Sequence, residues 1–102
     1  MNTMGSEVAT TEYVLPASEA LLVAVLALVT GHAQSQAPEQ RACLAAKVAA
    51  CLQLLGARAD LSPALRQAIE PLGLQWSHIG QCDLAAGVKD LYRRHPAPVN
   101  LQ

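Results

Sequence analysis

The stretch that decides the fold is Ala20-Leu21-Leu22-Val23-Ala24-Val25-Leu26-Ala27-Leu28-Val29, in which no residue carries a polar side chain. A helix formed by this stretch is apolar on every side, so other helices, a partner chain or lipid must surround it. The rest of the chain has to supply that cover. We therefore expect four of its residues to lie in the core or in a dimer seam, namely Leu22, Val25, Leu26 and Val29.

The apolar stretch is too short to predict a membrane span. A span needs roughly 20 apolar residues, and Glu19 and Gly31 limit this stretch on its two sides. The segment Gly31-His32-Ala33 has the small residues of a signal-peptide cleavage site. However, residues 1–19 contain no Lys or Arg and three Glu, which is the wrong charge for a signal peptide. We expect a cytoplasmic chain without a membrane partner.

The composition predicts one all-α domain. The chain has 102 residues, of which 52% are hydrophobic, and this content consists mainly of Ala and Leu, which are strong helix formers. Only 15% of the residues are charged and the net charge is −1, so there is no basic face for nucleic acid. Low charge also indicates a surface that is partly covered by protein. We predict a compact bundle of about four helices that forms a dimer.

Prolines, glycines and serines divide this domain into its helices. Ser18 and Ser62 are candidate N-caps, and Pro63 suits a first helical position. Pro71 disfavours helix at the residue before it, so the segment Leu72-Gly73-Leu74 is expected to be a turn. We predict a mobile tail, a helical domain and an extended tail, at residues 1–15, 16–95 and 96–102. Within the domain we predict helices at residues 16–32, 38–56, 63–70 and 75–95. The last helix either runs through Gly80 or breaks there, in which case Asp83 caps its second segment.

Two of the predicted helices carry an apolar stripe at helical spacing. In the second helix the stripe is made by Leu44, Val48, Cys51, Leu52 and Leu55. In the last helix it is made by Leu84, Val88, Leu91 and Tyr92. We expect the stripe of the second helix to face the core, and Tyr92 in the stripe of the last helix either to pack in the core or to contact a partner.

No motif in the sequence predicts an enzyme, a cofactor site or a metal site. The chain has no Gly-x-Ser-x-Gly elbow and no glycine-rich phosphate loop. Cys43, Cys51 and Cys82 form no Cys-x-x-Cys pair, and His78 with Cys82 gives two zinc ligands where a site needs four. We interpret the cysteines as buried small hydrophobic residues.

The best candidate for a functional motif is a helix-turn-helix around Gly73. Apolar residues stand near the positions that this motif requires. However, the stretch from Gln67 to Val88 contains no Lys or Arg, so its second helix has nothing to hold phosphates. A DNA-binding regulator of this class remains the alternative to a protein-binding one.

The region around the predicted turn is the expected binding site for a partner protein. It holds more large apolar side chains than two short helices need for docking. Trp76 either packs in the core or faces the partner, and if it faces the partner it is the expected anchor, because aromatic residues dominate binding hot spots. The predicted site consists of Leu65, Ile69, Leu72, Trp76 and Ile79.

In size, helical character, apolar first helix and near-neutral charge, the chain resembles the small helical antiactivators of bacterial quorum sensing, including the pseudomonad antiactivators of LasR. The resemblance covers the whole chain but includes no motif, so it transfers no functional residue. It implies a homodimer that captures a LuxR-type transcription factor through apolar surface and blocks its DNA binding.

The sequence predicts a dimer or a larger assembly in solution. The chain mass is 10.7 kDa. We expect sedimentation equilibrium at micromolar concentration to give at least twice this mass, because the apolar stretch needs more cover than one Ala-rich chain supplies. A single species of chain mass at all concentrations would contradict the prediction.

Overall fold

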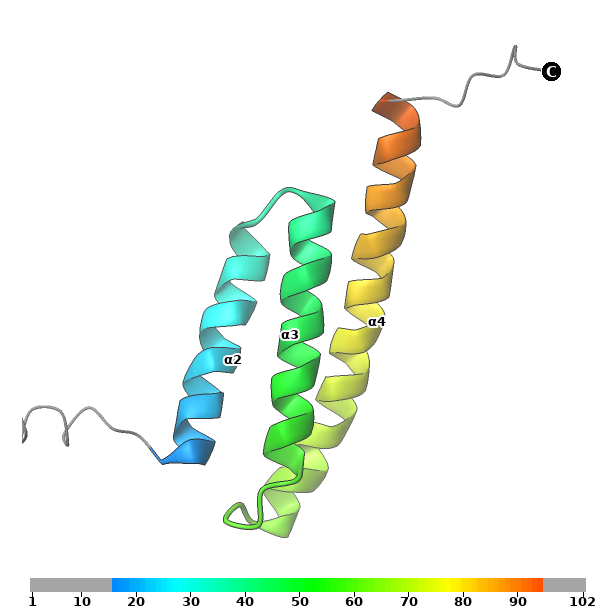
Figure 1. The fold of residues 1–102 in the computed structure, drawn as a ribbon. Coiled ribbons are helices and arrows are strands. Elements are labelled where there is room, and N and C mark those ends of the chain that lie inside the picture. The colour runs from blue at the N-terminus through cyan, green and yellow to red at the C-terminus, as the bar shows by residue number, and fades with distance from the viewer. Residues whose placement is uncertain (1–15, 95–102) are drawn as a thin grey trace, which may run out of the picture.

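The structure is a computed structural model that describes residues 16–94. In this range the chain forms three α-helices and no strand: Ala17–Gln34 (α2), Pro38–Gly56 (α3) and Pro63–Arg94 (α4) (Figure 1). Consecutive helices run in opposite directions, and α3 lies between the other two. The all-α prediction is confirmed, but the described residues form three helices rather than four. The two predicted tails and the predicted helix end at His95 lie outside the described residues.

Glycines at seven-residue spacing bring α4 close to α3. A Cβ built on Gly80 would lie 3.3 Å from Ala45 Cβ, and one on Gly87 would lie 3.4 Å from Pro38 Cβ. One heptad before Gly80, a Cβ built on Gly73 would lie 3.7 Å from Leu52 Cβ. A heptad spacing keeps one face of a helix against its neighbour, so the glycines form a continuous seam. We call this contact the glycine seam.

The predicted turn at Leu72-Gly73-Leu74 is wrong, because α4 continues through it and contains Pro71. A proline inside a helix leaves the carbonyl four residues earlier without its donor. That residue is Gln67, and both Gln67 and Pro71 are exposed, so water can satisfy the carbonyl. Packing along the glycine seam outweighs the local preference. The helix-turn-helix considered around Gly73 therefore has no turn.

The core lies where all three helices meet. Its buried members are Val48, Leu52, Leu55 and Ile69. The predicted stripe of α3 supplies the first three, so the core face of this helix is confirmed. Half-buried side chains pack around them, from α2, from the loop before α4 and from α4, namely Leu21, Val25, Leu28, Val29, Leu61 and Trp76.

Three of the predicted helix boundaries hold, and each is marked by a proline or a glycine, whereas α2 ends at Gln34, two residues after its predicted end. α3 begins at Pro38 and ends at Gly56, as predicted. The hydroxyl of Ser62 accepts a hydrogen bond from the backbone N–H of Leu65 at 3.2 Å, as an N-cap does. Ser18 is not an N-cap, because α2 already begins at Ala17 and the Ser18 side chain is buried.

We predict that Gly80→Val destabilises the chain. The new side chain would enter the gap beside Ala45, and overpacking of this kind typically costs about 1–3 kcal/mol. Urea unfolding followed by circular dichroism measures the loss. Ala86→Val, at an exposed position of the same helix, is the control and changes only helix propensity, by about 0.5 kcal/mol. Equal losses in the two variants would contradict the close packing at Gly80.

Candidate interaction surface

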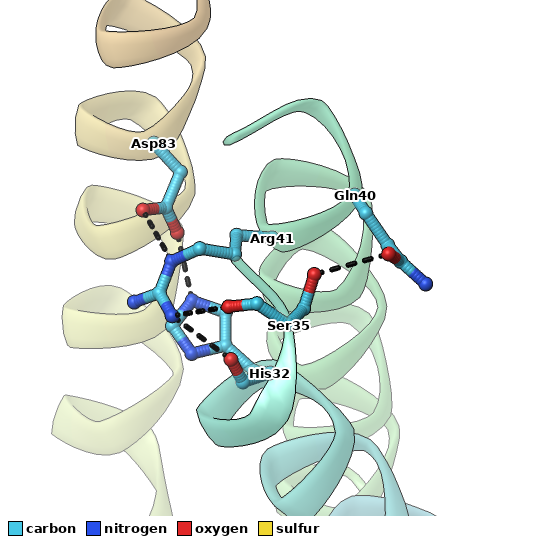
Figure 2. A network of polar contacts seen from close by, with 5 residues as sticks. All are labelled: His32, Ser35, Gln40, Arg41 and Asp83. Carbon is cyan, nitrogen blue, oxygen red and sulfur yellow. Dashed lines mark hydrogen bonds and ion pairs between the residues drawn. The ribbon is translucent and has the colours of Figure 1, made fainter. Parts of the chain in front are cut away.

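A buried hydrogen bond fastens the end of α2 to α4. His32 lies on α2, and its Nε2 is 2.7 Å from Oδ2 of Asp83 on α4 (Figure 2). The side chains are only 8% and 14% exposed. An ionised carboxylate can only accept, so Nε2 carries the proton and donates it to Asp83. The edge of the His32 ring also meets Trp76, with ring centroids 5.0 Å apart.

Arg41 connects this pair to the loop between α2 and α3. Its Nε donates to Oδ1 of Asp83 at 3.3 Å, and its Nη1 donates to the backbone carbonyls of His32 at 2.9 Å and Ser35 at 3.1 Å (Figure 2). These carbonyls belong to the last turn of α2 and its C-cap, where the usual donors four residues ahead are missing, and that of His32 also accepts the backbone N–H of Ser35 at 3.3 Å. His32, Arg41 and Asp83 thus tie all three helices together, and we call them the polar clamp.

The polar clamp favours the ionised form of Asp83. Partial burial opposes ionisation, but the hydrogen bonds from His32 and Arg41 and the charge of Arg41 outweigh it. The pKa of Asp83 is therefore lowered from its ordinary value of 3.8.

A second polar contact holds the other end of α2. The buried hydroxyl of Ser18 donates to the carboxylate of Asp60, with Oγ 2.7 Å from Oδ2. Nε of Arg58 donates to Ser18 Oγ at 3.1 Å and to Asp60 Oδ1 at 3.2 Å. The hydrogen bond from Ser18, followed by the contact with Arg58, lowers the pKa of Asp60. Ser18 and His32 are the buried residues of α2, so a polar contact holds each end of this helix.

The sequence interpretation missed both contacts. It considered Asp83 only as the cap of a broken helix and gave it no partner. One signal was present in the spacing, since Ser18 and His32 extend the inner face of α2 that contains Leu21, Val25 and Leu28. The steps along this face are three, four, three and four residues, as on one side of a packed helix.

The cysteines differ from their predicted burial. Cys43 and Cys82 are exposed and Cys51 is half-buried. Sγ of Cys82 lies 3.5 Å from Nε2 of His78, one turn away on the solvent side of α4. Among residues 16–94, no group of three or more His, Cys, Asp or Glu side chains is arranged to hold a metal ion.

The predicted partner-binding residues divide between the core and the surface. Ile69 is 5% exposed and belongs to the core, because it faces α3 near Gly56. Trp76 and Ile79 are half-buried. Leu65 and Leu72 are 41% and 44% exposed, so they are the two exposed residues of the predicted partner-binding site.

A larger apolar surface lies at the C-terminal end of α4. Gly87 faces Pro38, the first residue of α3, so residues 88–94 extend beyond α3 (Figure 1). The four large side chains of the stripe predicted in the last helix are 47–62% exposed: Leu84, Val88, Leu91 and Tyr92. Val88, Leu91 and Tyr92 lie past the first residue of α3, which therefore cannot cover them, whereas Leu84 lies beside α3 in a hollow that Ala42 and Ala46 also line. We call these four residues the α4 overhang.

The outer side of α2 is a second uncovered apolar surface. Leu22 and Leu26 are 40% and 67% exposed, whereas Val25 and Val29 are half-buried against the core. α2 is also the one described helix that is long and apolar enough to cross a membrane, judged by its length and composition alone. This is weak evidence for a membrane span, because core helices of soluble proteins and signal sequences near the N-terminus have the same length and composition.

We predict that Asp83→Asn lowers stability by about 1.5–3 kcal/mol at pH 7, since hydrogen bonds to charged groups contribute this much. The pKa of Asp83 is lower in the folded chain than its ordinary value of 3.8, so its ionised form stabilises the fold above that pH. The difference from wild type should shrink as the pH falls below 3.8 and through the folded pKa. Urea unfolding at several pH values measures it.

Asp90→Asn is the matched control. Asp90 pairs with Arg94 at 2.7 Å on the outer part of α4, where Arg94 is 68% exposed. Such a pair contributes little, so the variant should lose less than about 0.5 kcal/mol. A loss for Asp83→Asn that stays constant down to pH 2 would contradict the role of the carboxylate.

Comparisons with protein-family models, with curated proteins and with solved structures find no match to this chain.

Proposed function

We propose that the chain is a non-enzymatic regulator that binds a partner protein and covers a surface that the partner needs. The observation that carries this proposal is the α4 overhang. Its four large apolar side chains are 47–62% exposed, and three of them, Val88, Leu91 and Tyr92, stand on the helix end that extends beyond α3. Contiguous exposed apolar residues of this size are typical of protein-binding surfaces.

The chemistry of the overhang indicates the kind of surface that it would bind. Leu84, Val88 and Leu91 repeat at steps of four and three residues, which is the spacing of a helix that inserts into an apolar groove. Lys89 and Arg93 are exposed on the same segment and lie away from this stripe. The matching partner surface is therefore an apolar groove with an acidic rim.

The outer side of α2 suits a second copy of the chain. Leu22, Leu26 and Ala33 are exposed along this side and follow steps of four and seven residues, as one edge of a helix-pair seam does. The segment from residue 20 to residue 38 contains no charged side chain, so a partner surface gains nothing from charge there. An equally apolar helix is the matching surface, and α2 of another copy is one. We propose a homodimer formed along this side.

The resemblance in size and composition makes a LuxR-type transcription factor the first partner to test. An overhang seated on such a receptor would cover a surface that the receptor uses to dimerise or to contact DNA. This assignment requires that both proteins occupy the cytoplasm.

We predict that the double variant Val88→Ser with Leu91→Ser weakens partner binding at least tenfold, because it removes two apolar contacts at the centre of the overhang. Binding to the LuxR-type receptors of the native host, measured by co-purification and then by calorimetry, tests this. Circular dichroism should stay unchanged, since neither side chain packs in the core.

The control is Ala85→Ser with Ala86→Ser, which adds the same hydroxyl groups on the same turn of α4 at other exposed positions. The control should bind as wild type does. Equal affinity of both double variants would contradict the overhang as the binding surface. Wild type that binds no LuxR-type receptor would contradict that choice of partner.

A further inference from the structure

A groove between α3 and α4 lies apart from both apolar surfaces described above. Its volume is about 560 Å³, which falls within the range of small-molecule sites. The lining comes from the C-terminal half of α3, the first half of α4 and the loop between them, and includes no residue of α2 or of the α4 overhang. Its apolar wall contains Leu52, Ile69 and Leu74. Gly73, which faces Leu52 across the glycine seam, also lines the groove.

One polar group in this groove lacks a hydrogen-bond partner. Nε of Arg66 is buried and makes no hydrogen bond within the described chain. Glu70 is one turn further along α4 and lines the same groove, but the two side chains form no ion pair. A buried donor without an acceptor is unfavourable, and a guanidinium is the group that best matches a carboxylate.

We propose that this groove binds a small amphiphile that has a carboxylate at one end and a hydrocarbon chain behind it. The carboxylate pairs with the guanidinium of Arg66, and a modest rotation of that side chain lets Nε and a terminal nitrogen donate together. The hydrocarbon chain lies along Ile69, Gly73 and Leu74. This site is independent of the protein-binding function, because it shares no residue with the α4 overhang or with the outer side of α2.

The spacing along α4 sets the length of the ligand. From Arg66 to Leu74 the helix rises roughly 12 Å, which is about the length of an extended ten-carbon chain. Decanoate is therefore the probe, and decylammonium is its counterpart with the same chain and the opposite charge. Both are used below their micelle concentrations, so that each molecule binds singly.

The test is isothermal titration of the full chain with each probe. Decanoate should bind saturably and at least tenfold more tightly than decylammonium. Arg66→Gln should weaken decanoate binding at least tenfold and remove the preference between the two probes. Glu70→Gln should tighten decanoate binding, because it removes the negative charge that faces the ligand carboxylate. Arg93→Gln, at an exposed arginine outside the groove, should bind as wild type does.

Three results would overturn the proposal. The first is no saturable binding of decanoate, and the second is equal affinity for the two probes, which would leave a merely apolar surface. The third is unchanged affinity in Arg66→Gln. Should that variant fail to fold, the preference of wild type for decanoate and the effect of Glu70→Gln still decide the question. Loss of receptor binding in the overhang variants has no bearing on these titrations.

Discussion

The close approach of α3 and α4 is the contact on which the rest of the fold depends. Three glycines of α4 meet Pro38, Ala45 and Leu52 of α3, and each meeting is one heptad from the next. An Ala-rich chain without Phe has few large side chains with which to fill wide gaps between helices. Bringing two backbones together is the other way to gain dense packing, because contact energy falls steeply with separation. This contact also keeps α4 helical through Pro71.

α2 is attached in a different way. Its inner apolar side chains are half-buried rather than buried, and its two buried side chains are polar. Ser18 and His32 are each satisfied by a carboxylate from another part of the chain. Buried polar groups need specific partners, so these contacts fix the position of α2 more than they add to its stability. The same arrangement leaves Leu22 and Leu26 in solvent.

The sequence predicted what local signals determine and missed what distant residues determine. Pro38, Gly56 and Pro63 mark helix ends by their own backbone restrictions, and these boundaries were predicted correctly. Pro71 carries the same kind of signal, but packing between α4 and α3 overrides it. His32 and Asp83 are hydrogen-bond partners but lie 51 residues apart in the chain, so no local sequence pattern specifies their pairing. The stripe of the α4 overhang was predicted from its spacing, but its exposure was not, because the spacing identifies an apolar face and not the element that covers it.

The polar clamp also explains why the overhang stays uncovered. If α4 were shifted along α3 by seven residues, glycines of α4 would still face α3 at the glycine seam. The spacing of the glycines alone therefore does not determine which residues of α4 lie opposite which residues of α3. The shift that moves residues 88–94 beside α3 would place Gly87 opposite Ala45. It would also carry Asp83 about 10 Å along the helix axis, away from His32 and Arg41. The buried imidazole of His32 and the half-buried guanidinium of Arg41 would then lose the carboxylate that they share, and leaving such groups without a partner is costly. The clamp therefore selects the register in which the apolar end of α4 extends beyond its neighbours.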